Sequence, residues 1–227
     1  MRTTIVLYIV ATLFLTTIFC AKNNTGKVAV LNDSLPQTEI RQRAVALNNQ
    51  AIHMQMSFNK DSLKEAANLL VEAIEIDSSY TLAFINLAEI QSMLGQVEEA
   101  MITLKRALKG DVNDRNLLFG IGYFYDLLEE PDSAQLFYDK SLKAFEECIY
   151  MFPDSLLLVV NQHFITSIAK NDTTIMSRFL KDYQCKYPHA DYLQIPVQAY
   201  TKKDFLRSLV LPEFREDLHK EIENRHR

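Results

Sequence analysis

Glycine is scarce in this chain, with 5 among 227 residues, and tryptophan is absent. Tight turns between strands depend on glycine, because few other residues adopt a positive φ without strain. The low glycine content therefore argues against an architecture of short strands and turns. Apolar residues instead recur at helical spacing along the chain, and no segment has the alternation of a strand. We predict an all-α protein.

The motifs that carry catalysis are also missing. None of the five histidines forms a metal-spaced pair with another histidine or a cysteine. The chain contains no phosphate loop, nucleophile elbow or dinucleotide fingerprint. The acidic pairs Glu98-Glu99 and Glu129-Glu130 are adjacent in sequence, so their carboxylates point in different directions from a helix or turn. We expect no enzyme activity, no cofactor and no metal.

Charge argues against a nucleic-acid partner. The formal net charge is −5, and the basic residues are scattered along the chain. A nucleic-acid surface gathers them on one face with interleaved aromatic side chains.

Residues 1–21 have the layout of an export signal. Arg2 precedes a mostly apolar run from Ile5 to Ala21, as in a secretory leader. Cys20 at its end is a candidate for acylation, after which it would be the lipid-bearing first residue. Two alternatives stay open: a cleaved leader that releases a soluble protein, and a retained anchor, since 17 residues lie at the lower limit for spanning about 30 Å. All three place the folded part outside the cytoplasm.

Residues 22–36 are polar and end at a proline, so we predict a flexible tether that precedes the folded part. Together with the leader, this organisation predicts an exported, membrane-anchored protein of the periplasm, a lipoprotein of a Gram-negative outer membrane.

A period of 34 residues organises the rest of the chain. Small residues and large apolar residues each recur at this interval, where two helices of a hairpin would touch. The small positions are Ala66, Ala100 and Ala134, and the large ones are Leu70, Leu104 and Tyr138. Gly95 makes the turn of the most regular unit, residues 81–114.

This pattern resembles the tetratricopeptide repeat, whose period is about 34 residues. The resemblance implies an α-α superhelix, a solenoid of helical hairpins, over residues 37–190. Its units would be 47–80, 81–114, an extended 115–152 and a divergent 157–190, followed by C-terminal capping helices in 191–227. Glu129 stands where the third unit would have its turn glycine, and the tryptophan typical of the first helix is absent.

The resemblance also implies that the first helix of each unit lines a concave groove. The outward positions of these helices are the candidate partner-binding residues. They are Asn48, Ile52, Ile85, Asn86, Glu89, Met93, Phe119, Tyr123 and Asp126. If exposed, they would form an apolar and aromatic groove with an acidic rim, suited to an extended or helical peptide. The alternative is that neighbouring helices or the long N-terminal helix cover them.

Two functions remain in competition. The leading hypothesis is a non-catalytic scaffold or adaptor that is exported, tethered to the membrane and binds a peptide or protein segment in the groove. The alternative is an accessory lipoprotein that binds carbohydrate or another small ligand on stacked aromatic rings. The rings available for that role are Tyr123, Phe124, Tyr125 and Tyr138.

Two features of the C-terminal half also have alternatives. The helix expected at 212–225 is either a solvated cap or a surface for a partner or membrane. Cys148 and Cys185 are either a disulfide pair or unpaired core thiols.

Overall fold

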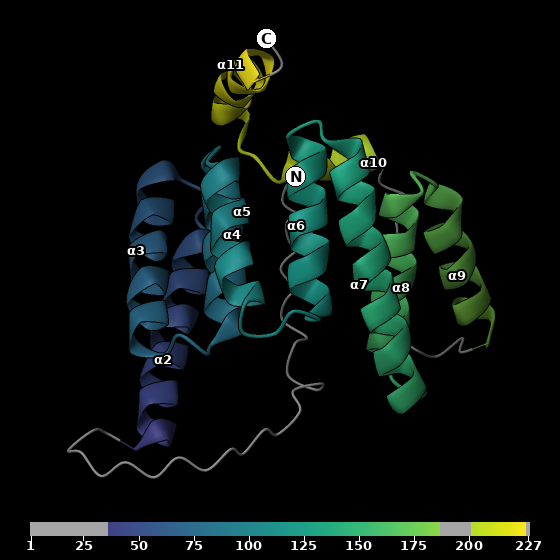
Figure 1. Ribbon diagram of the computed structural model, residues 1–227, viewed down its shortest axis with the longest axis horizontal. Coiled ribbons are helices and arrows are strands. Elements are labelled where there is room, and N and C mark those ends of the chain that lie inside the picture. Colours follow the sequence, from purple (N-terminus) through teal and green to yellow (C-terminus); the bar gives the residue numbers. More distant parts are fainter. Residues whose placement is uncertain (1–35, 187–200, 226–227) are drawn as a thin grey trace.

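The computed structural model describes residues 36–186 and 201–225 (Figure 1). All regular secondary structure within these ranges is helical, which confirms the all-α prediction. The elements are α2 (Gln37–Gln55), α3 (Lys60–Ile76), α4 (Thr81–Met93), α5 (Val97–Leu108), α6 (Arg115–Leu127), α7 (Pro131–Met151), α8 (Leu156–Ala169), α9 (Thr173–Lys186), α10 (Lys202–Ser208), the short 3-10 helix η3 (Pro212–Phe214) and α11 (Arg215–Arg225).

Four hairpins stack side by side: α2–α3, α4–α5, α6–α7 and α8–α9 (Figure 1). Each helix packs on the one before it and the one after it, which is the arrangement of a solenoid. The predicted helical-hairpin solenoid is thus confirmed. The second helix of the third hairpin, α7, is 21 residues long, longer than the 17 residues of α3 and the 12 of α5.

The repeated positions lie where the two helices of a hairpin meet. Ala66, Ala100 and Ala134 are each 0% exposed. The large residues one turn further on, Leu70, Leu104 and Tyr138, are also buried. Small residues let the helices approach closely, and the large residues then fill the space beside the contact.

The turn inside each hairpin contains a residue with positive φ. These residues are Phe58 (φ 51°), Gly95 (φ 80°), Glu129 (φ 59°) and Asn171 (φ 49°). In the last three turns the next residue donates its N–H to a carbonyl five residues earlier, which ends the first helix in the usual left-handed manner. The third unit therefore keeps the turn geometry without the glycine.

Part of the predicted organisation falls outside the described ranges. This applies to the leader 1–21 with Cys20, to the tether up to residue 35, and to residues 187–200. Of the helices in 36–186 and 201–225, none combines the length and the hydropathy of a membrane span.

Candidate functional site

The inner face of the solenoid is defined here as the surface of the first helices α2, α4, α6 and α8 on the side where α10 packs against α6 and α8. The chain itself occupies part of this face. The expected C-terminal helices are present, but α10 folds back and contacts α6 and α8. Residues 209–214 then continue along the same face to α4, and α11 follows beyond them (Figure 1).

An aromatic cluster holds α10 in place. The ring of Phe205 stacks on Phe119 with centroids 6.1 Å apart. It meets Tyr123 and Phe164 edge-on, at 5.9 Å and 5.4 Å. Because Phe205 is only 2% exposed, nearly its whole ring area is removed from water at this contact.

An ion pair lies beside the cluster. Lys202 Nζ is 2.6 Å from Asp126 Oδ2. The same carboxylate oxygen accepts a hydrogen bond of 2.6 Å from the Tyr138 hydroxyl. Burial, and then the neighbouring Asp126, raise the pKa of Tyr138 well above its ordinary value, so the hydroxyl stays protonated and donates. Asp126 thus receives two charge-assisted contacts at its partly buried position.

Two hydrogen bonds to its backbone fix the segment that follows α10. Leu211 donates its N–H to the carbonyl of Met93, at 3.0 Å. Ser92 donates its hydroxyl to the carbonyl of Leu209, at 3.1 Å. These two bonds tie the C-terminal segment to the last turn of α4, so the inner face binds backbone as well as side chains.

The part of the inner face formed by α2 and α4 is polar. Asn86 Nδ2 donates to Asn48 Oδ1 at 2.7 Å, and Gln55 Nε2 lies 3.5 Å from the sulfur of Met93. Burial raises the pKa of Glu89 to about 7, an effect that the Gln55 amide partly offsets. Two buried atoms here have no hydrogen-bond partner: Asn48 Nδ2 and Glu89 Oε1.

Of the two alternatives for the groove residues, exposed or covered, the structure excludes exposure for seven of the nine candidates, which are buried. They are Asn48, Ile85, Asn86, Glu89, Met93, Phe119 and Tyr123. Ile52 and Asp126 are half-buried. The structure agrees with the alternative that other helices cover these positions. For Phe119 and Tyr123, however, the covering helix is the C-terminal α10 and not the N-terminal helix. Whether these residues bind a partner stays a prediction.

One signal in the sequence points to this cover. The segment of α4, TLAFINLAEIQSM, carries apolar residues around its whole circumference, and ten of its thirteen residues are buried. A helix that is apolar all round is buried all round. The composition of α4 therefore indicates that something packs on its outward side, although it does not say what.

The aromatic residues considered for a sugar site belong to the core. Tyr123, Phe124 and Tyr138 are at most 2% exposed. Tyr125 is half-buried, and its hydroxyl accepts a hydrogen bond of 2.9 Å from Lys105. No two of these four rings lie open as a stacking platform for a carbohydrate.

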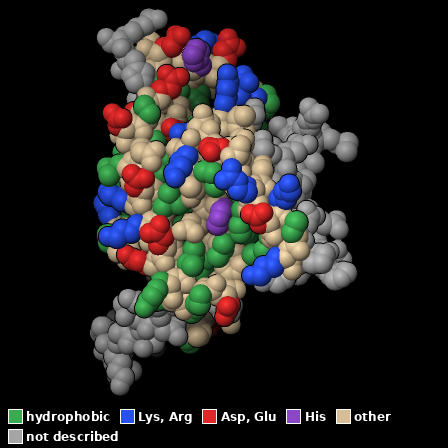
Figure 2. Space-filling model, turned by 90° about the vertical axis from the view of Figure 1, so that its right-hand side faces the viewer, with side chains coloured by type: hydrophobic (Ala, Val, Ile, Leu, Met, Phe, Trp, Pro, Cys, Tyr) green, Lys and Arg blue, Asp and Glu red, His purple; other side chains and the backbone are tan. Residues whose placement is uncertain are grey.

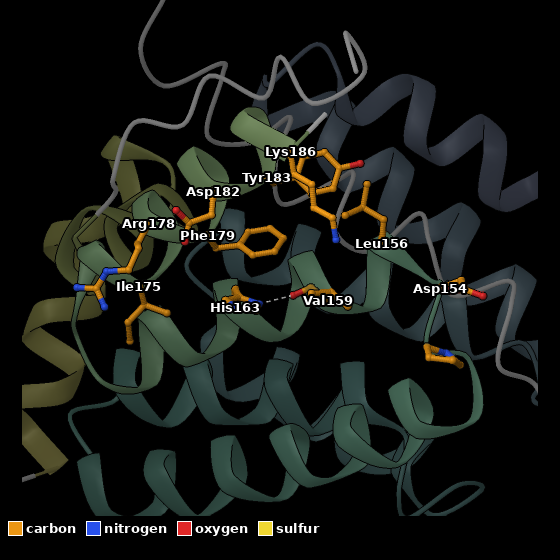
Figure 3. Close-up of a pocket in the computed structure, with 11 residues that line it drawn as sticks. Asp154, Leu156, Val159, His163, Ile175, Arg178, Phe179, Asp182, Tyr183 and Lys186 are labelled. Carbon is orange, nitrogen blue, oxygen red and sulfur yellow. Dashed lines mark hydrogen bonds between the residues drawn. The ribbon is translucent and has the colours of Figure 1, made fainter. Parts of the chain in front are cut away.

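A second surface lies at the end of the array. The face that α8 and α9 present there shows hydrophobic side chains between acidic and basic ones (Figure 2). A hollow of about 840 Å³ opens between the two helices. Within it His163 stacks on Phe179, with ring centroids 4.2 Å apart, and its Nδ1 lies 2.8 Å from the carbonyl oxygen of Val159 (Figure 3). Its charged residues are of both signs, which gives it no preference for an anion or a cation.

Nothing in the described part of the chain suggests reaction chemistry. Among residues 36–186 and 201–225, no three His, Cys, Asp or Glu side chains gather as metal ligands would. Cys148 and Cys185 are not joined by a disulfide; Cys148 is half-buried, with its sulfur 3.6 Å from Arg115, and Cys185 is exposed.

Comparison with known proteins agrees with the geometry. Residues 60–119 match the family of the tetratricopeptide repeat. The matched stretch begins at α3, takes in α4 and α5 and ends within α6. A comparison with curated proteins gives no match. The chain is therefore similar to the tetratricopeptide repeat family over residues 60–119, and its other hairpins continue the same all-α solenoid on both sides.

Proposed function

We propose that this protein is a non-catalytic adaptor whose inner face binds a segment of a partner protein. Tetratricopeptide repeats are typically scaffolds that mediate contacts between proteins. The observation that supports the proposal most is the packing of α10 on the inner face. The inner face already holds the short helix α10 through one cation and one aromatic ring, and it holds the segment after α10 through two hydrogen bonds to that segment's backbone. A face built this way fits a helical protein segment better than a small ligand.

The adaptor is also proposed to be exported and held at a membrane, in the periplasm at a Gram-negative outer membrane. Support comes from residues 1–21, where a positive charge precedes an apolar run that ends near Cys20. Acylation of Cys20 would anchor the chain in the membrane, and the polar tether of residues 22–36 would let the folded part stand away from the membrane surface. The partner is then a protein or peptide, with no role for nucleic acid.

The binding proposal is tested by photo-crosslinking in the cells that make the protein. A photoreactive residue at position 49 or 53 would stand beside Asn48 and Ile52, because Asn49 and His53 are exposed on α2. The control is the same residue at position 102, since Ile102 is 59% exposed on the second helix α5. Adducts with one protein at 49 or 53, absent at 102, support binding at the inner face. Equal adducts at all three positions, or none at any, contradict it.

Alanine substitutions at the aromatic residues Phe119 and Tyr123 are not suited to testing partner binding. Phe119 and Tyr123 are 5% and 2% exposed, so alanine at either position would cost about 3–5 kcal/mol of folding free energy. Loss of a partner from such a variant would report unfolding.

The tether has its own test. The wild-type chain and a Cys20→Ser variant would be labelled with a radioactive fatty acid and separated into membrane and soluble fractions. We expect label and membrane association in the wild type alone. Label in neither chain would contradict acylation, and a membrane-bound Cys20→Ser chain without label would favour the retained anchor.

A further inference from the structure

We propose that residues 202–211 are a built-in, displaceable occupant of the inner face, and that the partner segment is a helix with the same pattern: a cation, an aromatic residue three positions later and an aliphatic residue four positions after that. This inference rests on the proposed function, because it names the chemistry of the partner at the same site.

The contacts of α10 define the pattern. Lys202 pairs with Asp126, and Phe205 enters the aromatic cluster. Leu209, just beyond the helix, is 2% exposed, and its carbonyl accepts from Ser92. These positions are related as i, i+3 and i+7, and in a partner helix that continued past the third anchor this spacing would place all three on one face. The neighbouring Lys203 and Arg207 are exposed, so we do not include them in the binding pattern.

The helical form of α10 depends on its contacts with the inner face. It has seven residues, and helices shorter than about 12 residues are marginal in water without tertiary contacts. Residues 187–200 separate it in sequence from α9, so it is not an extension of the array. A segment of this kind can open locally while the hairpins stay folded.

The fit of the occupant is also incomplete. Its last bond to α4 is made by Leu211 at Met93, whereas Asn48 Nδ2 and Glu89 Oε1 stay buried without partners.

The occupant would act as a tethered competitor. A segment in the same chain as its site has an effective concentration on the order of millimolar. A free segment of equal affinity therefore binds the closed chain much more weakly than an opened chain. Only a partner with more contacts, or one at high local concentration on a membrane, would displace α10.

The test uses a fluorescent peptide with the sequence of residues 201–211, TKKDFLRSLVL, titrated onto the full chain in mild detergent. The opened variant is Lys202→Glu/Phe205→Ser, which removes both the cation and the ring. Lys203→Glu is the matched control, because it makes the same charge change on the exposed side of α10. We expect the peptide to bind the opened variant at least about tenfold more tightly than the wild type or the control. A peptide with serine in place of the phenylalanine should not bind.

Equal binding to all three chains would overturn the inference, as would no binding to an opened variant that is helical and melts cooperatively. If the opened variant does not fold, hydrogen exchange of the wild-type chain tests the same inference. The amide of Leu211, which donates to Met93, should exchange at least about tenfold faster than amides in the middle of α6. Exchange of both at the rate of global unfolding would overturn the inference.

The two proposals fail separately. Peptide binding confined to the opened variant, without partner adducts at positions 49 and 53, would support the built-in occupant and contradict the adaptor function. Partner adducts with equal peptide binding by all chains would support the adaptor and contradict the occupant.

Discussion

Gly122 and Tyr138 fill one space between α6 and α7. A Cβ atom on Gly122 would lie 2.7 Å from Cδ1 of the Tyr138 ring. One period earlier the same two positions hold Ala88 and Leu104. The third unit thus exchanges a methyl group on the first helix for a larger ring on the second, and the hairpin keeps its packing.

The first prediction follows from this pair. Gly122→Ala should lower the free energy of unfolding by about 1–3 kcal/mol, because the buried Tyr138 ring must move. Adding Tyr138→Leu should make the double variant less destabilised than the sum of the two single changes. Urea unfolding measures all three. Gly110→Ala is the control, since its Cβ meets nothing closer than 3.4 Å. Strict additivity would contradict the shared space.

The second prediction concerns the turn of the third hairpin. Glu129 has φ 59°, a conformation that costs a residue with a Cβ roughly 1–2 kcal/mol. Glu129→Gly should therefore raise the free energy of unfolding by about 1 kcal/mol. The gain is smaller than the full strain because glycine also gives the unfolded chain more conformational entropy. Gly95→Ala should act in the opposite direction, because Gly95 has φ 80° and a Cβ there would lie 2.8 Å from Cβ of Phe214. Thermal melts of both variants measure this, and a lower melting temperature for Glu129→Gly would contradict it.

The third prediction is a pH dependence that arises at Glu89. Burial raises its pKa in the folded protein to about 7, from 4.5 in the absence of these surroundings. Between these values the folded state keeps a proton that the unfolded state has lost. Stability should therefore fall as pH rises through this window, by up to about 3 kcal/mol, and level off above it.

Glu89→Gln removes this titration. Relative to the wild type, the variant should gain about 1–3 kcal/mol between pH 5 and pH 8 in urea unfolding. Glu65→Gln, which removes an exposed carboxylate from α3, is the matched control. Parallel stability profiles for the wild type and Glu89→Gln would show that Glu89 does not titrate in this window.

Local pattern was sufficient to predict the hairpins. The positions of Ala66, Ala100 and Ala134 depend on contacts between helices that follow one another in sequence, so a fixed period reveals them. The left-handed turn at Glu129 could be placed for the same reason, from its register with Gly95.

The state of the inner face could not be predicted in this way. Its cover depends on contacts between distant residues, such as the bond from Ser92 to Leu209, 117 positions apart. The period fixes which way Phe119 and Tyr123 point relative to their own hairpin. It carries no information about a segment that returns from beyond the last repeat.

A zero-length carbodiimide cross-link would show whether α10 occupies the inner face in solution. Lys202 Nζ lies 2.6 Å from Asp126 Oδ2, close enough for amide formation without a spacer. Mass spectrometry of the monomer should find Lys202 joined to Asp126, and mixed light- and heavy-isotope chains should show the link within one chain. Lys203, which is exposed, should not form it. Lys202 joined to other carboxylates, or to Asp126 only between chains, would show that α10 does not pack on the inner face of its own chain.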